Sequence, residues 1–206
     1  DSQFRRTAFF MGEFRQRANR ELFDDLSIRS QRAFSYLHWW MPGGRRAADL
    51  AVEDCDALIG LLRSGDFAQL GPFGEFFVDP VRQMRAAANR RAGRPWDAIA
   101  DYETLLIPDS FALVDWAASY VETLVALRSG RRDVPGTPSS ATDYLDQAVL
   151  KLEQAFRQAA QLQMLGVPRG EERRTIRSRI RSDPIFEFIA EHERVRPLMA
   201  EPTGRR

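Results

Sequence analysis

Apolar residues recur every three or four positions along most of this chain, and glycine or proline interrupts each run. Phe14, Ala18 and Leu22, for example, fall along one side of a helix. The two-residue alternation that marks half-buried strands is scarcely visible. The spacing therefore predicts an all-α chain.

Glycine and proline also predict where the helices begin and end. Asp79-Pro80 suits a helix start, because the aspartate can accept from free amide groups and proline loses nothing at the first helical position. Asp183-Pro184 repeats this signal, and Gly93 suits a helix end. We expect a first helix from residue 10 that either runs on or restarts near Ser30, with a stop at 42–44. Further helices are expected over 47–62, 80–91, 95–107, 110–129, 140–165 and 171–181, with a loop over 70–79 and a last helix from 184.

The stretch 93–109 contains several acids, which could mark an active site or simply face water. Helical spacing predicts that Ala98, Tyr102, Leu105 and Leu106 form its buried stripe. Asp97, Asp101 and Glu103 lie off that stripe, and Trp96 and Trp116 are expected in the core. We therefore expect the acids to face solvent.

The chain resembles itself at a fixed spacing of fifty residues. AIADYETLL, from Ala98, aligns with AVLKLEQAF, from Ala148, and a weaker copy, ADLAVEDCD, begins at Ala48. The small alanine lets a neighbouring helix approach closely, while Tyr102 or Leu152 fills the space one turn later. Such repetition indicates stacked helical units that cannot bury their apolar faces alone.

These positions resemble the second-helix signature of the tetratricopeptide repeat (TPR) family, which is a small residue, an aromatic four later and an alanine three after that. Matching residues from about Pro80 to Met199 are Ala98, Tyr102 and Leu105; Ala148, Leu152 and Ala155; and the first-helix positions Val81, Met84, Ala88, Leu113, Trp116, Ala117 and Tyr120. SDPIFEFIAEHERVRPLM also resembles the tail that closes many bacterial repeat arrays. The resemblance implies a right-handed stack of antiparallel helical hairpins, a TPR-like α-solenoid, with a C-terminal capping helix.

A chain of 206 residues with 44% hydrophobic content is sufficient for a substantial core. We predict one continuous domain in three parts. These are an N-terminal helical hairpin over 1–64, two TPR-like hairpins over 80–165, and an Arg-rich segment with the C-terminal cap over 166–206.

The resemblance implies a non-catalytic protein–protein interaction scaffold or assembly subunit, with another protein as its partner. The first helix of each hairpin would line the binding groove. Its candidate contacts are Gln83, Ala87 and Arg90 in one hairpin and Val114, Ser119 and Thr123 in the next.

Aromatic and arginine side chains supply further candidate contacts. Trp39 and Trp40 lie near an expected loop, where exposed aromatics beside arginine are typical of interface hot spots. The alternative is that they join adjacent hairpins in the core. Arg173 and Arg177 belong to RRTIRSRIR, in which Ile176 and its neighbour a turn later could dock while the arginines stay in water. An acidic patch on a protein fits this segment better than RNA, because no aromatics for base stacking are interleaved.

Composition argues against several other classes of function. The net charge of +1, with an acidic middle and basic ends, argues against a nucleic-acid binder that works by phosphate neutralisation. The single cysteine, Cys55, excludes an internal disulfide and a cysteine-rich zinc site. No stretch approaches the roughly 20 consecutive apolar residues of a membrane span. We expect no cofactor. The oligomeric state stays open, and a cytoplasmic location is favoured over an extracytoplasmic one reached through a removed signal segment.

Catalytic motifs are not found. HExxH, GxSxG and GxGxxG do not occur, and Lys151, the single lysine among 30 basic residues, follows no glycine-rich turn. Asp49, Glu53 and Asp56 share one helix face and form the best metal candidate, although an ion-paired, solvated face explains them as well. Two alternatives to a scaffold therefore remain, a regulatory or sensor segment of a larger bacterial signalling protein and a metal-dependent all-α enzyme.

Overall fold

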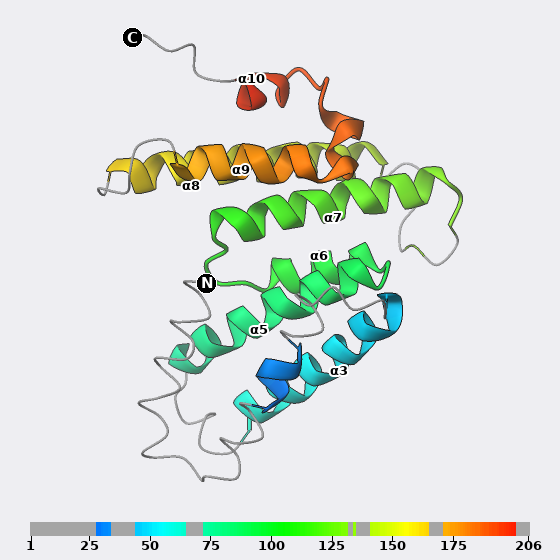
Figure 1. Cartoon of the computed structure of the whole chain (residues 1–206), viewed down its shortest axis with the longest axis vertical. Coiled ribbons are helices and arrows are strands. Elements are labelled where there is room, and N and C mark those ends of the chain that lie inside the picture. Colours follow the sequence, from blue (N-terminus) through cyan, green and yellow to red (C-terminus); the bar gives the residue numbers. More distant parts are fainter. Residues whose placement is uncertain are drawn as a thin grey trace. The chain divides into compact units, whose positions relative to one another are not determined.

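A computed structural model describes residues 28–33, 44–64, 72–131, 134, 141–164 and 171–200 (Figure 1). Every regular element within these ranges is helical, and they contain no strand. The all-α prediction is therefore confirmed. Clustering of contacts divides the chain into two units, Asp1–Ile107 and Pro108–Arg206, which we take in turn.

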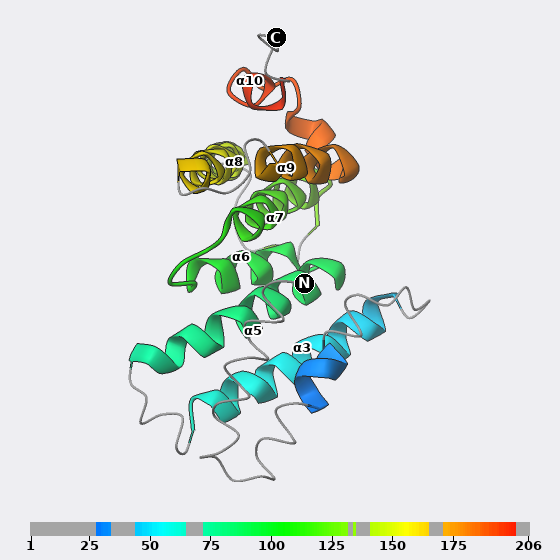
Figure 2. The ribbon, with the colours of Figure 1, turned by 60° about the vertical axis from the view of Figure 1, so that its left-hand side comes forward.

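The first unit is built on α3 (Gly44–Leu62), α5 (Pro72–Arg91) and α6 (Pro95–Glu103) (Figure 2). Two ion pairs give the relative direction of α3 and α5. Asp56 of α3 contacts Arg85 of α5. Arg63, seven residues further along the chain just after α3, contacts Glu75, which lies ten residues before Arg85 on α5. Helices α3 and α5 are thus antiparallel. A tight turn at Gly93, with φ 79°, then reverses the chain into α6.

Apolar side chains at helical spacing hold α3 against α5. One buried cluster joins Ala33, Cys55, Leu58, Ile59, Leu62, Val78 and Val81. Buried aliphatic side chains contribute about 1.5–3 kcal/mol each relative to exposed ones. The helical segment 28–33 adds polar anchors, since Arg32 and Arg29 both reach the buried carboxylate of Asp54 on α3. This segment is therefore fixed by both apolar and ionic contacts.

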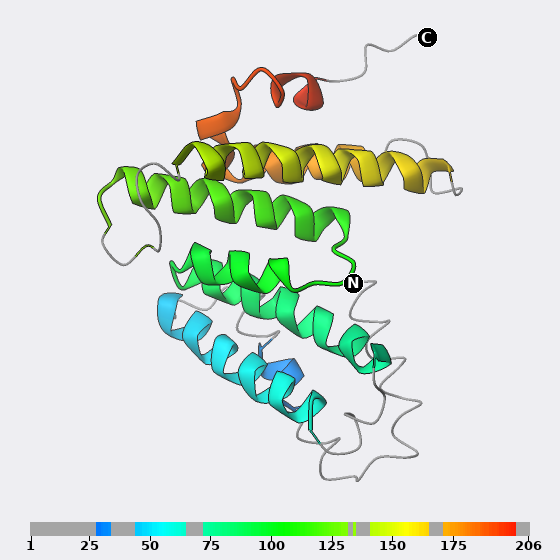
Figure 3. The ribbon, with the colours of Figure 1, turned by 180° about the vertical axis from the view of Figure 1, so that it is seen from behind.

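The second unit contains α7 (Ser110–Arg128), α8 (Ala141–Met164), α9 (Glu171–Ser182), the 3-10 helix η2 (Pro184–Ile189) and α10 (Arg196–Met199) (Figure 3). The side chain of Asp109 begins α7 by accepting from the Ala112 amide at 2.7 Å. The ammonium of Lys151 lies 3.6 Å from the ring centre of Trp116, while Tyr120 contacts Tyr144. From the first contact to the second, the residue number rises along α7 and falls along α8, so these two helices are antiparallel.

Helix α9 runs in the same direction as α7. Ser110 bonds to Glu172 near the start of both helices, and Asp115 bonds to Arg179 about two turns further on. The predicted apolar stripe of α9 is confirmed, because its isoleucines, Ile176 and Ile180, are buried. Helices α7 and α9 are therefore parallel neighbours.

After α9, the side chain of Asp183 accepts from the Ile185 amide and starts η2, as the Asp-Pro signal predicts. The element is a 3-10 helix and not the α-helix expected there. It buries Phe186 and Ile189 and contacts both α7 and α9. The C-terminal tail thus packs onto the preceding helices through apolar side chains.

Helix α5 begins eight residues earlier than predicted. It starts at Pro72, and Pro80 lies inside it. The predicted loop over 70–79 is therefore wrong for its described residues, 72–79. Pro80 removes one helical hydrogen bond, but Val78 and Val81 on either side of it are buried against α3. Burial of these side chains outweighs the local break.

Helix α6 is shorter than predicted and ends at Glu103. The hydroxyl of Thr104 donates to the Asp101 carbonyl at 2.8 Å, and the chain then turns away from the helix axis. Leu106 is 53% exposed, so its predicted place in a buried stripe is wrong. Trp116 is buried as predicted, but Trp96 is only half-buried.

Candidate functional site

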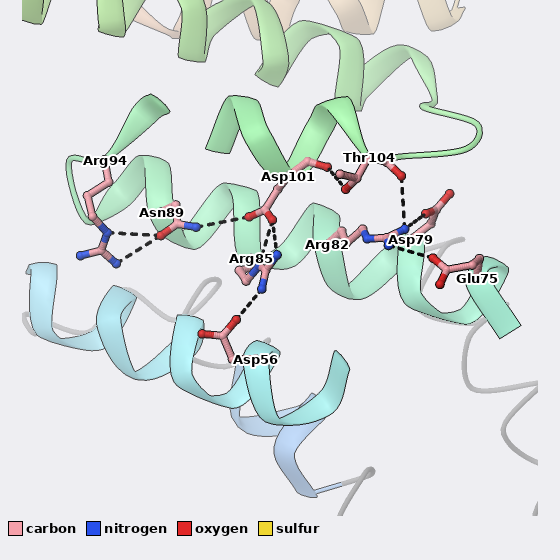
Figure 4. A network of polar contacts seen from close by, with 9 residues as sticks. All are labelled: Asp56, Glu75, Asp79, Arg82, Arg85, Asn89, Arg94, Asp101 and Thr104. Atoms are coloured by element: carbon pink, nitrogen blue, oxygen red, sulfur yellow. Dashed lines mark hydrogen bonds and ion pairs between the residues drawn. The ribbon is translucent and has the colours of Figure 1, made fainter. Parts of the chain in front are cut away.

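A connected row of charged and polar side chains runs along α5 between α3 and α6 (Figure 4). Asp101 of α6 lies at its centre and is only 4% exposed. Its carboxylate accepts from Arg85 Nε at 2.9 Å and from Asn89 Nδ2 at 3.2 Å. Arg85 also donates to Asp56 of α3, so one guanidinium joins three helices. The prediction that Asp101 faces water is wrong, because helical spacing locates a residue on a face but not the charged partner opposite it.

The row continues beyond Asp101 and returns to α3. The Asn89 side-chain oxygen accepts from Arg94 Nε and Nη2 at 3.3 and 3.2 Å. Arg94 Nη1 in turn donates to Asp49 of α3 at 2.6 Å. We call this closed set of contacts the polar ring; its members in order are Asp56, Arg85, Asp101, Asn89, Arg94 and Asp49.

A second group of contacts holds the end of α6. Arg82 is buried and binds Asp79 at 3.0 Å, Glu75 at 2.8 Å and the Thr104 carbonyl at 3.2 Å. Asp79 also accepts from the Leu106 amide at 2.9 Å. Asp79 therefore does not cap a helix start as predicted. It satisfies a backbone donor on the neighbouring segment, while Arg82 satisfies an acceptor.

Burial and hydrogen bonding act in opposite directions on the carboxyl of Asp101. Burial raises its pKa, hydrogen bonds from Arg85 and Asn89 lower it, and the pKa stays above its ordinary value. For the thiol of Cys55 the effect of burial dominates and raises its pKa to about 12. Cys55 is thus an unreactive thiol at neutral pH, as expected for a buried cysteine.

The three metal candidates on α3 do not form a cluster of free carboxylates. Asp49 and Asp56 bind Arg94 and Arg85, while Glu53 between them is exposed. Within the described ranges, no group of three or more His, Cys, Asp or Glu side chains is placed to hold a metal ion. The arginines come from α5 and the turn before α6, which the sequence pattern of α3 alone could not reveal.

The predicted contacts Gln83, Ala87 and Arg90 are half-buried along α5. They are spaced so that they share one side of that helix. Ala87 also packs against the small-residue contact between Ala51 and Ala88. These three positions stay candidate contacts for a partner.

The candidates on α7 are wrong. Val114, Ser119 and Thr123 are fully buried, and the Thr123 hydroxyl donates to the Ser119 carbonyl. The partly exposed residues of α7 are instead Phe111, Asp115, Glu122, Val125 and Leu127. The hydroxyls of Ser119 and Thr123 donate to carbonyls within the helix, which lets these two residues lie in the core.

Arginines of the predicted basic segment serve different purposes. Arg179 forms a double contact with Asp115, through Nε at 3.1 Å and Nη2, and lies over the Phe111 ring at 5.9 Å. Arg177 Nε donates to the Leu198 carbonyl at 2.9 Å. Arg173 is half-buried, and its Nε is buried without an acceptor among the described atoms. The prediction that all these arginines stay in water is therefore wrong for Arg177 and Arg179, which form hydrogen bonds within the chain.

Two further predicted contacts, Trp39 and Trp40, lie outside the described residues. One pair that the sequence did not reveal joins α8 to the tail, with Arg194 Nε and Nη2 donating to Glu153 at 2.9 and 2.8 Å. The two residues are far apart in sequence, and no local motif connects them.

One described helix, α7, is long and apolar enough to cross a bilayer by length and composition alone. However, 72% of the apolar stretch of α7 is buried within the structure, and the core helix of a folded domain passes the same test.

Comparison with known proteins finds no family model, no curated protein and no solved structure that matches this chain.

Proposed function

We propose that this chain is a non-catalytic protein-binding scaffold made of stacked TPR-like helical hairpins with a C-terminal cap. One observation carries the proposal, namely that positions fifty residues apart are buried alike. Ala98 and Ala148 are both 0% exposed, and Tyr102 and its counterpart Leu152 are both fully buried. Equal burial at equal spacing is what a repeated packing unit requires.

The second unit gives further support through the order of its helices. Helix α8 returns antiparallel to α7, and α9 then runs parallel to α7 beside it. The first helix of a following hairpin would take the place of α9. In such a stack each hairpin buries its apolar face against the next and leaves extended surfaces for partners.

A partner-capture experiment tests the scaffold. The full chain is immobilised, exposed to extract of its source cells, and bound proteins are identified after cross-linking. We expect discrete partners that are lost with Arg90→Glu but kept with Arg128→Glu, a control with the same charge change at the exposed end of α7. Circular dichroism checks that both variants fold. A folded chain that captures nothing would count against the scaffold, and equal loss in both variants would count against the predicted contacts.

A further inference from the structure

The 3-10 helix η2, which follows α9 (Figure 1), carries an exposed aromatic side chain. Phe188 is 60% exposed, whereas every other aromatic side chain that the structure describes is buried or half-buried. Contact with water is unfavourable for a phenyl ring, and aromatic side chains are enriched where proteins bind each other. Phe188 therefore marks a candidate contact surface on the second unit.

The geometry of η2 determines which side chains share that surface. A 3-10 helix has three residues per turn, so residues three apart lie above one another in a ridge. One ridge, Phe186 and Ile189, is buried. Backbone bonds from Ala190 to Glu187 at 3.5 Å and from His192 to Ile189 at 3.0 Å continue this spacing past the end of η2. The other two ridges therefore lie on the outer side.

These outer ridges combine apolar side chains with carboxylates. We call them the cap face; its members are Pro184, Ile185, Glu187, Phe188, Ala190 and Glu191. Both glutamates are exposed, and neither forms an ion pair with a residue in the described part of the chain. With His192 neutral, residues 184–193 contain three glutamates and no arginine or lysine, which gives a formal charge of −3. The exposed ring thus lies in an acidic stretch.

The cap face is held in place from both ends. Before it, the Asp183 side chain accepts from the Ile185 amide at 3.1 Å. After it, Arg194 binds Glu153 of α8 through two hydrogen bonds. A surface that is ordered in advance loses little entropy when a partner binds. The end of a helical stack normally presents a polar outer face to water, so an exposed ring at this position indicates a contact.

We propose that the cap face binds a basic amphipathic segment of a protein partner, an inference that rests on the scaffold function proposed above and adds a second contact surface to it. Apolar side chains of the segment would cover Phe188, and its lysines or arginines would lie beside Glu187 and Glu191. An arginine above the phenyl ring would add a cation–π contact. Nucleic acids and anionic membranes fit less well, because the two carboxylates repel phosphate.

Binding of a fluorescent helical peptide of leucine and lysine to the full chain, followed by anisotropy, tests the inference. We expect Phe188→Ala to weaken binding about tenfold, because it removes the apolar anchor. Glu187→Gln and Glu191→Gln should each weaken it about threefold, and this loss should shrink at high salt. Circular dichroism confirms that the variants fold.

Two exposed positions of the first unit supply matched controls. Ile107 is 67% exposed, and Glu53 is exposed on α3. Ile107→Ala and Glu53→Gln repeat the same losses of apolar surface and of charge outside the cap face. Both should leave the affinity within about twofold. A peptide with glutamate in place of lysine should bind at least about tenfold more weakly, because its charge repels that of the cap face.

Three results would overturn the inference. One is an equal loss of affinity in Phe188→Ala and Ile107→Ala, and another is equal binding of the lysine and glutamate peptides. The third is self-association that sedimentation velocity detects in the original chain and that Phe188→Ala abolishes, which would make a second copy the occupant.

The partner-capture experiment separates the cap face from the scaffold. Loss of a captured partner with Phe188→Ala but not with Ile107→Ala would support the cap face. If a partner is captured equally by the original chain and by Phe188→Ala, the scaffold stands and the cap face is wrong. If the original chain captures nothing, the scaffold itself is contradicted, even where the lysine peptide binds.

Discussion

Single residues of the first unit differ sharply in what they stabilise, and the acids of one short helix illustrate this. Asp101 and Asp97 both belong to α6, yet the first is buried among donors and the second lies 3.4 Å from Arg94 with its side chain 47% exposed. Removing a buried carboxylate that satisfies two donors costs far more than removing one member of an exposed pair, because the buried donors are left without a partner. The two aspartates therefore form a natural matched comparison.

We expect Asp101→Ala to lower the free energy of unfolding by roughly 3 kcal/mol, because it leaves Arg85 and Asn89 with unmet donors. Asp97→Ala should change it by less than about 0.5 kcal/mol. Urea denaturation followed by circular dichroism measures both. Equal effects would show that the polar ring contributes nothing beyond an exposed ion pair.

Replacement of two glycines of the first unit by alanine should change the stability in opposite directions. Gly60 lies within α3, and an added methyl group would meet nothing within 4 Å, so Gly60→Ala should stabilise the chain by about 1 kcal/mol. Gly93 has φ 79°, a conformation that alanine adopts only with strain, so Gly93→Ala should destabilise by roughly 1 kcal/mol. Thermal melting of the two variants tests the signs. Destabilisation by Gly60→Ala would contradict the open surroundings of that position.

At the scale of elements, short pieces of the second unit are held by long side chains more than by their own helical bonds. Helix α10 has only four residues, and helices of this length are unstable alone. Its anchors are Arg177 and Arg181, and the tail before it is tied to α8 by Arg194 and Glu153. The tail should therefore respond to conditions that alter these pairs.

Acid should release the tail from α8. The hydrogen bond from Arg194 lowers the pKa of Glu153, so the pair stabilises fully above the ordinary glutamate pKa and is lost as pH falls through the lowered one. At neutral pH we expect Glu153→Gln to speed hydrogen exchange over 186–199, and the difference from the original chain should shrink as the pH falls through the lowered pKa of Glu153. Glu191→Gln, at an exposed acid, is the control. A difference that is unchanged at low pH would contradict the ionic origin.

Element types and several helix ends were predictable from the sequence, whereas the start of α5, the end of α6 and the ion-pair partners were not. Spacing and glycine signals located α7, because they are local. The start of α5 was missed, because burial of Val78 and Val81 against α3 overrides the local cost of Pro80. Asp101 and Arg179 were misjudged for a related reason, since their partners come from other helices that no local pattern identifies.

At the scale of the whole molecule, the division at residues 107 and 108 predicts that the two units open separately. Cys55 can report on the first unit, because a buried thiol with a pKa of about 12 reacts only after opening. We expect Asp101→Ala to accelerate labelling by an aromatic disulfide reagent, whereas Arg194→Ala in the second unit should not. Equal acceleration in both variants would show that the chain opens as a single cooperative body.

The polar ring also limits how the length of α3 can vary. Its two contacts on α3, Asp49 and Asp56, are seven residues and so about two turns apart. One residue inserted between them would rotate one carboxylate by about 100° away from its arginine, even if every side chain of the ring were retained. Insertions and deletions in this stretch should therefore be selected against more strongly than substitutions, which makes its length a feature to look for in distant relatives.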